Sequence, residues 1–186
     1  MTHFGKQLSR AAIGSVLALF ASVALAALPE GAKAPDFQLN AALAGKPMTF
    51  SLAQALHKGP VVLYFFPAAF TKGCTIEAHA FAEATEDFNK LNATVIGVTA
   101  GNIDRVAEFS NVECRDKFAV AADPGAKVAA EYQTQFTTKS GTALSERTSF
   151  VIAPDGKILM SYTDPSPEQH IQKTMNAVKA WHDAAK

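Results

Sequence analysis

The stretch "PVVLYFFPAAFTKGCTIEAHAF", residues 60–81, joins an apolar run to a helical pattern and contains a cysteine. Residues 60–66 are continuously apolar and rich in β-branched and aromatic side chains, which is typical of a buried strand. From residue 74 to 91 apolar side chains recur at steps of four or three, which predicts a helix with one apolar stripe: Ile76, Ala80, Ala84, Phe88 and Leu91. Cys74 is therefore expected in the first turn of a helix that follows a buried strand.

Further strands and helices alternate on the C-terminal side of this unit. Strands are predicted at 93–99 and 118–123, and helices at 102–110 and 124–132. Residues 147–162 predict a hairpin, because Asp155-Gly156 is the pair that a tight primed turn needs. A last helix is predicted after Ser166 as its N-cap, with apolar residues at helical spacing: Ile171, Met175 and Val178.

The predicted order is β–α–β–α–β–α–β–β–α. Strands that alternate with helices favour a parallel sheet, and the late hairpin adds antiparallel strands. We therefore expect an α/β fold, a thioredoxin-like three-layer sandwich with a mixed sheet and flanking helices. A fold of this kind does not by itself fix the function.

The first 26 residues have the three parts of a secretory signal peptide. Lys6 and Arg10 precede an apolar core, and Ala24-Leu25-Ala26 places small residues at a cleavage site. The alternative is an uncleaved membrane anchor, because the uncharged stretch 11–28 has 18 residues, the lower limit for a span. We expect cleavage, which leaves residues 27–186 as one exported domain in a bacterial periplasm, without stable membrane association.

Composition excludes some classes of function. Of 186 residues, 48% are hydrophobic and the formal net charge is zero, so no nucleic-acid partner is indicated. No clustered His/Cys set predicts a metal site, and no cofactor is expected. His57, His170 and His182 are scattered and are predicted to lie at the surface.

The exported domain has two cysteines, Cys74 and Cys114. In an oxidising compartment the simplest prediction is a structural disulfide. It would close a loop of about 40 residues and stabilise the fold by about 3–4 kcal/mol. The alternative is that Cys74 is chemically active, because its place at a helix start would favour a thiolate over a thiol. Thr71, three residues earlier, is a good N-cap residue on the same turn.

The pattern Pro67-x-x-x-Thr71-x-x-Cys74, after a buried strand and opening a helix, resembles the active-site signature of the peroxiredoxins. The stretch "LYFFPAAFTKGCTIEAHAF" is most similar to the bacterioferritin-comigratory, or Q-type, branch. The resemblance runs from about Pro35 to the C-terminal helix. It implies an antioxidant thiol-dependent peroxidase that reduces hydrogen peroxide and organic hydroperoxides. Cys74 would attack the O–O bond and become a sulfenic acid.

The resemblance also implies roles for neighbouring residues. Pro67 would shield the thiolate, Thr71 would orient the peroxide, and a distant arginine, Arg147 by position, would complete the pocket. A guanidinium there would stabilise both the thiolate and the charge that develops on the leaving oxygen. Glu77 lies three residues after Cys74 on the same helix face. An unpaired carboxylate there would raise the pKa of the Cys74 thiol, so we expect Glu77 to be paired with an arginine.

Many Q-type members carry the resolving cysteine five residues after the first, where this chain has His79. His79 is predicted to be an ordinary helix-surface or partly buried histidine. Cys114 then becomes the candidate that resolves the sulfenic acid as an intramolecular disulfide. Arg115 and Lys117 beside it could favour its thiolate. Cys114 as a bystander and Cys114 as an intermolecular partner remain alternatives.

Two other functions are possible for this fold. A thiol–disulfide oxidoreductase or copper-delivery protein needs two close cysteines, and Thr71 occupies the first of those positions here. A non-catalytic domain with a structural disulfide would leave Pro67, Thr71 and Arg147 without a common purpose. The resemblance implies a thioredoxin-like or other thiol protein as reductant, and a monomer.

Overall fold

The computed structural model describes residue 1 and residues 26–184. The predicted signal peptide, residues 1–26, lies outside the described residues except for its first and last positions. Among the described residues, no helix is both long and apolar enough to cross a bilayer.

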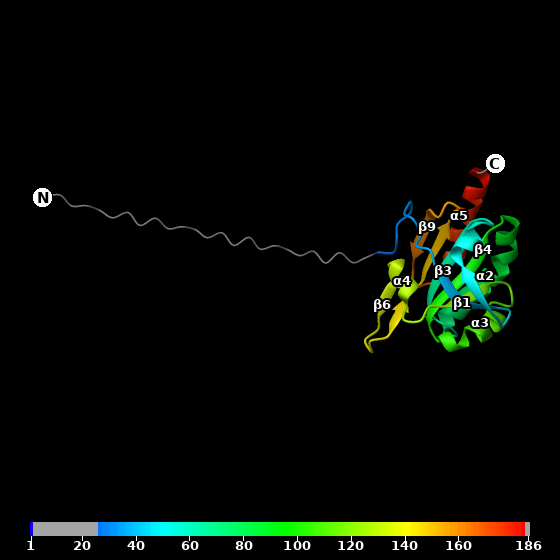
Figure 1. Cartoon of the computed structure of the whole chain (residues 1–186), viewed down its shortest axis with the longest axis horizontal. Coiled ribbons are helices and arrows are strands. Elements are labelled where there is room, and N and C mark those ends of the chain that lie inside the picture. Colours follow the sequence, from blue (N-terminus) through cyan, green and yellow to red (C-terminus); the bar gives the residue numbers. More distant parts are fainter. Residues whose placement is uncertain (2–25, 185–186) are drawn as a thin grey trace.

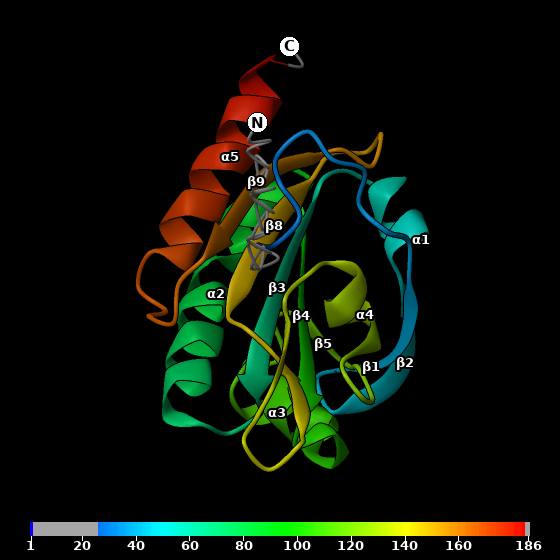
Figure 2. The same ribbon diagram turned by 90° about the vertical axis from the view of Figure 1, so that its left-hand side faces the viewer.

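The core of the fold is a seven-stranded mixed sheet in the order β2-β1-β5-β4-β3-β8-β9 (Figures 1 and 2). The pairs β3–β4 and β4–β5 are parallel and the other pairs are antiparallel. The strands are β1 Gln38–Leu43, β2 Lys46–Ser51, β3 Val61–Ala68, β4 Thr94–Gly101, β5 Ala119–Ala122, β8 Thr148–Ile152 and β9 Ile158–Thr163. A separate two-stranded hairpin is formed by β6 Gln135–Thr137 and β7 Ala143–Ser145.

Helices cover both faces of the sheet, which confirms the three-layer thioredoxin-like sandwich (Figure 2). The helices are α1 Leu52–Leu56, α2 Lys72–Lys90, the short 3₁₀ helix η1 Ile103–Arg105, α3 Val106–Val112, α4 Lys127–Glu131 and α5 His170–Ala184. Helices α2, α3 and α5 share one core cluster, and α1 and α4 share the other.

Strand β3 connects the two core clusters. Its alternate side chains point to opposite faces, so Val62, Tyr64 and Phe66 pack in the cluster under α2, while Val61 and its period-two neighbours pack in the other. Every side chain from residue 61 to 66 is fully buried. Burial of an apolar side chain of this size stabilises by about 1.5–3 kcal/mol, which explains why this run fixes the centre of the sheet.

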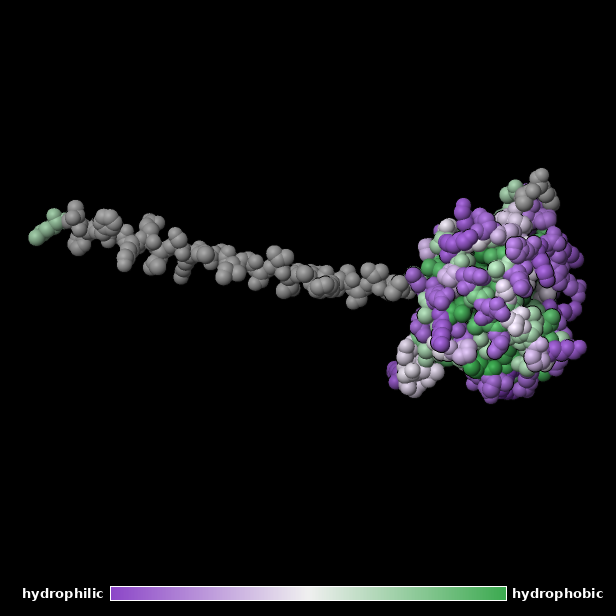
Figure 3. Space-filling model, viewed as in Figure 1, coloured by the Kyte–Doolittle hydropathy of each residue, from purple (hydrophilic) through white to green (hydrophobic). Residues whose placement is uncertain are grey.

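Figure 3 shows hydrophilic residues over much of the surface in that view, with smaller hydrophobic areas between them. The largest buried side chains are aromatic, and several of them stack across the cluster under α2, as Tyr64 does on Phe81 with ring centroids 4.5 Å apart. Such aromatic pairs add to the area buried.

Two predictions of local structure need correction, and one hairpin was not predicted. The predicted stripe of α2 is right at Phe88, which is buried, but wrong at Ile76, which is 46% exposed. The buried face also includes Glu77, whose carboxyl group has a partner in the core. The C-terminal helix begins at His170 and not just after Ser166, where Asp164 instead accepts a hydrogen bond from the Ser166 backbone. The hairpin β1–β2 was not predicted, since its turn at Ala44-Gly45 has positive φ at both residues without an Asn or Asp to signal it.

Candidate active site

The loop that carries the site begins where β3 extends beyond the end of its neighbour β8. Pairing of β3 with β8 ends at Phe65, so Pro67 lies beyond the β8 ladder. On the other side, Phe66 pairs with Thr99 and Ala68 with Gly101, and Pro67 is skipped. A proline without an N–H group therefore costs no hydrogen bond here, and it can lead the chain out of the sheet toward α2.

The turn after Pro67 is held by the segment that contains η1 and α3. Phe70 has a positive φ of 62°, which a bulky residue adopts only when its surroundings enforce it. Its ring meets Phe109 edge to face at 5.2 Å, and the guanidinium carbon of Arg105 lies 3.8 Å from its centroid. Asn102 donates a side-chain hydrogen bond to the Ala69 carbonyl at 2.7 Å. Together these contacts fix the backbone that presents Thr71.

Thr71 is the N-cap residue of α2, as predicted, but its hydroxyl does not cap the helix. It donates instead to the carbonyl of Ala68 at 3.1 Å. That bond uses the hydroxyl proton and leaves the oxygen free to accept a hydrogen bond. Cys74 lies at the third helical position and is 1% exposed. The free N–H groups of this first turn favour an anion at that place.

Arg147 reaches the site from the segment between β7 and β8. Its Nη2 donates to Cys74 Sγ at 3.5 Å, its Nη1 donates to Glu77 Oε2, and its Nε donates to the carbonyl of Pro165 at 2.9 Å. The guanidinium is 7% exposed. Arginine stays charged in proteins and presents its donors in a rigid plane, so one side chain is fixed by three partners and directs a full positive charge at the sulfur.

Glu77 is the partner that sequence analysis expected for this arginine, and it is fully buried. Burial raises the pKa of Glu77 to about 8, although Arg147 acts in the opposite direction. Near neutral pH the carboxyl therefore retains a proton and does not repel the Cys74 thiolate. The second oxygen, Oε1, has no hydrogen-bond partner within the described residues.

His170 corrects the prediction that the histidines lie at the surface. It is fully buried, and its Nδ1 lies 3.8 Å from Glu77 Oε1. Ser149 is hydrogen-bonded to the same Nδ1 at 2.8 Å, and Nε2 donates to the carbonyl of Asp164 at 3.0 Å. Burial lowers the pKa of His170. Sequence reasoning missed the burial of His170 because its partners are distant in the chain, and no local signal indicates them.

A model of the AhpC/TSA family matches residues 31–161, which include Pro67, Thr71, Cys74, Glu77 and Arg147. The chain belongs to that family. A putative peroxiredoxin of the bcp type from Helicobacter pylori is 31% identical over 155 residues, which is 81% of this chain and 98% of the relative. The chloroplastic peroxiredoxin Q of Sedum lineare is 30% identical over 156 residues, 83% of this chain and 80% of that protein.

Solved structures indicate the same family. The crystal structure of the peroxidoxin BcpB from Mycobacterium tuberculosis superposes with a TM-score of 0.72 at 30% identity, and covers 81% of this chain and 96% of that one. The protein is thus a peroxiredoxin, similar to the bacterioferritin-comigratory and Q-type members, and a thiol-dependent peroxidase. No group of three or more metal-ligating side chains occurs in the described part of the chain.

The second cysteine of this peroxiredoxin, Cys114, lies in the same core cluster as Cys74, and both are free thiols. The expectation that its neighbours favour a thiolate is wrong. Burial raises the pKa of Cys114, and Glu113 beside it adds to the effect. Arg115 and Lys117 are instead each paired with a glutamate on α2.

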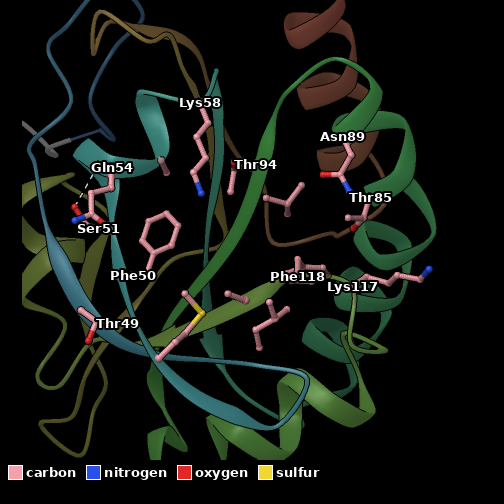
Figure 4. A pocket seen from close by; sticks show the side chains of 15 residues that line it. Thr49, Phe50, Ser51, Gln54, Lys58, Thr85, Asn89, Thr94, Lys117 and Phe118 are labelled. Atoms are coloured by element: carbon pink, nitrogen blue, oxygen red, sulfur yellow. Dashed lines mark hydrogen bonds between the residues drawn. The ribbon is translucent and has the colours of Figure 1, made fainter.

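A cavity of about 390 Å³ opens beside the guanidinium. Its lining is mostly apolar and comes from four separate parts of the chain: Pro67, Phe136, Glu146, Arg147, Thr163 and Pro165. It offers room for a substrate next to the charged group that faces Cys74. A second cavity of about 330 Å³ lies between β2 and α2 (Figure 4), and none of the predicted site residues lines it.

Proposed function

We propose that Cys74 is the residue that attacks peroxide in this peroxidase. The thiolate attacks the nearer oxygen of the substrate, an S–O bond forms and the O–O bond breaks. Cys74 becomes a sulfenic acid, and the leaving oxygen departs as water or an alcohol after it gains a proton. The sulfur is oxidised by two electrons and the peroxide is reduced by two, so no cofactor is needed.

The contact between Arg147 and Cys74 carries this proposal. A guanidinium held 3.5 Å from the sulfur can stabilise the thiolate and the charge that grows on the departing oxygen. Thr71 would accept a hydrogen bond from the peroxide O–H, because its own proton is used by Ala68. Pro67 would keep water from the sulfur, and Glu77 would hold the guanidinium in its plane.

We propose that both hydrogen peroxide and organic hydroperoxides are substrates. The cavity beside Arg147 has proline and phenylalanine in its walls, and apolar walls of this kind accommodate an alkyl or aryl group. A small peroxide needs only the guanidinium and Thr71. We expect the apolar cavity to matter for the larger substrate alone.

We propose that Cys114 then resolves the sulfenic acid as an intramolecular disulfide. The observation that supports this role is that Cys114 lies in the core cluster that also contains Cys74. A bystander or an intermolecular partner would be the alternative for Cys114. A thioredoxin-like protein is the proposed thiol reductant of the disulfide.

Stopped-flow oxidation of the reduced chain by hydrogen peroxide tests these roles. Wild type should react far faster than a free thiol and end as an internal disulfide by mass. Cys74→Ser should abolish the fast reaction, and Cys114→Ser should keep it but stop at a sulfenic or sulfinic acid. A wild-type rate no faster than a free thiol would show that Cys74 is not activated.

We also propose that the chain is exported to a bacterial periplasm as a cleaved, monomeric protein. The three-part N-terminal sequence supports export, and the resemblance to the Q-type branch supports a monomer. Expression in a bacterial host, followed by N-terminal sequencing of the periplasmic fraction and light scattering, checks both. A mature chain that begins at Ala27 is expected; a chain retained in the membrane fraction would indicate an anchor.

A further inference from the structure

Three side-chain pairs connect helix α2 to the short segment that contains Cys114: two are ion pairs, and the third is a hydrogen bond between His79 and Glu113. Glu113 pairs with His79 at 2.7 Å, Arg115 with Glu83 at 3.1 Å, and Lys117 with Glu86 at 2.9 Å. The α2 partners are spaced by four and three residues, so they lie along one face of the helix. The partners in the segment are spaced by two. We call these three pairs the ladder, and Cys114 stands between its first two rungs.

The backbone under the ladder is strained. Arg115 and Asp116 are consecutive non-glycine residues with positive φ, at 50° and 60°. Such residues persist only where surrounding contacts enforce them. A side-chain bond from Asn111 to Asp116 at 2.8 Å supports the turn, and the ladder holds it against α2. The strained turn should therefore open more readily than its neighbours once the ion pairs are weakened.

Cys114 cannot react in the closed position. Its side chain is fully buried, and burial raises its pKa. A thiolate, not a thiol, attacks a sulfenic acid. The segment that follows it, from Lys117 to Ala119, borders the cavity between β2 and α2 (Figure 4), which leaves space on one side of this end of the segment. Opening of the turn would bring Cys114 out of the apolar cluster and allow it to ionise.

We propose that the ladder is a latch that sets the rate at which Cys114 resolves the sulfenic acid on Cys74. This inference rests on the proposed role of Cys114. After opening, the Cys114 thiolate attacks the sulfur of Cys74, an S–S bond forms and the S–O bond breaks. Hydroxide leaves and takes up the proton that Cys114 lost, which gives water. Glu83, Arg115 and their neighbours are thus positioning residues and do not touch the peroxide.

The test uses charge reversal at an exposed rung. Stopped-flow fluorescence should show a first phase whose rate depends on peroxide concentration and a second, independent phase for disulfide formation. Glu83→Arg should speed the second phase about two- to fivefold, the effect of one exposed ion pair, and leave the first unchanged. The double variant Glu83→Arg/Arg115→Glu should restore the wild-type rate. Asp87→Asn removes an exposed α2 charge that is paired with Lys90 and leaves the three ladder pairs in place, so as the control it should change neither phase.

Salt gives a second test on the unmodified chain, because exposed ion pairs are screened. The wild-type second phase should rise with added potassium chloride, and the Glu83→Arg phase should respond less. Disulfide formation at one rate in every variant would overturn the latch alone. Slower formation in Glu83→Arg would show that the ladder holds Cys114 in its reactive position, which also overturns it.

A third measurement separates the latch from the proposed role of Cys114. In a Cys74→Ser background, alkylation of Cys114 by iodoacetamide reports opening without any peroxide. Glu83→Arg should raise this alkylation rate about two- to fivefold. Absence of a wild-type disulfide would refute the resolving role, and with it the proposed function of the latch. An unchanged alkylation rate would refute opening control by the ladder itself.

Discussion

Gly73 gives the guanidinium of Arg147 its place beside the sulfur. A Cβ at this position would lie 3.0 Å from Arg147 Nη2, which is closer than such atoms normally approach. Arg147 cannot yield freely, because Glu77 and the Pro165 carbonyl hold its other nitrogens. Glycine at position 73 therefore leaves room for the guanidinium beside Cys74, a role that helix propensity alone would not indicate.

Gly73→Ala should slow the reaction of Cys74 with hydrogen peroxide roughly tenfold, since small displacements of a group that contacts the reacting atom are costly. The change in stability should be small, because the helix propensity of alanine, favoured over glycine by up to about 1 kcal/mol, offsets part of the cost of displacing Arg147. Stopped-flow rates and urea unfolding measure the two effects. A variant with an unchanged rate would mean that the guanidinium does not need its present position.

Glu77 should make the rate of reaction of Cys74 with peroxide fall at alkaline pH. Its pKa is raised to about 8 by burial, against the effect of Arg147, so it is protonated at neutral pH and ionises above pH 8. The ionised form would compete for the charge of Arg147 and add negative charge beside Cys74.

The rate constant with peroxide should therefore fall roughly tenfold as pH rises through about 8. Glu77→Gln imitates the protonated form, so it should keep the neutral-pH rate and lose the alkaline fall. A pH–rate profile of both proteins checks this. An alkaline fall that persists in the glutamine variant would assign it to another group.

At the scale of elements, the hairpin β6–β7 supplies one wall of the site. It lies outside the main sheet, and Phe136 in β6 is 37% exposed while it lines the cavity beside Arg147. The strand β3, the loop and α2 provide Pro67, Thr71 and Cys74, and Arg147 comes from the segment between β7 and β8. The hairpin contributes mostly apolar surface. We therefore expect the hairpin to influence substrate choice and not the chemical step.

Phe136→Ser should lower the rate of reaction with an aryl hydroperoxide such as cumene hydroperoxide about three- to tenfold. This is the effect expected when the substrate loses part of its apolar contact with the cavity wall. The rate with hydrogen peroxide should stay the same, because that substrate needs no apolar wall. Competition between the two substrates gives the ratio directly. An equal loss for both would indicate that the hairpin supports the catalytic geometry instead.

At the scale of the whole molecule, burial of Glu77 and His170 makes the free energy of unfolding depend on pH. The Glu77 pKa is higher in the folded chain, about 8, than in the unfolded chain, about 4.3. The unfolded state thus releases the proton first, so stability falls as pH rises between these values. Burial lowers the pKa of His170, and that group reduces stability only below about pH 6.5.

The free energy of unfolding should fall by about 2 kcal/mol from pH 6.5 to 8, which is about 1.4 kcal/mol for each pH unit. Glu77→Gln should remove this slope and leave the acid side unchanged. Urea titrations across the pH range measure both curves. A slope that survives the substitution would contradict the assignment to Glu77.

The sequence alone determined the centre of this protein. The apolar run at 60–66 set a fully buried interior strand of the sheet, and the pattern that follows placed Thr71 and Cys74 at the start of a helix. These are local signals: strand burial, a capping residue and helical periodicity act within a few residues of one another. The alternation of elements was enough to predict the three-layer fold.

Only the tertiary structure decided what surrounds Cys74. Arg147 and His170 reach Glu77 from distant parts of the chain, and their burial depends on partners that no local pattern specifies. The apolar stripe of α2 was misplaced for the same reason, since a carboxyl group can enter a core only when a partner elsewhere meets it. The state of Cys114 was likewise set by packing, because neighbouring charges matter less to a thiol than removal from water.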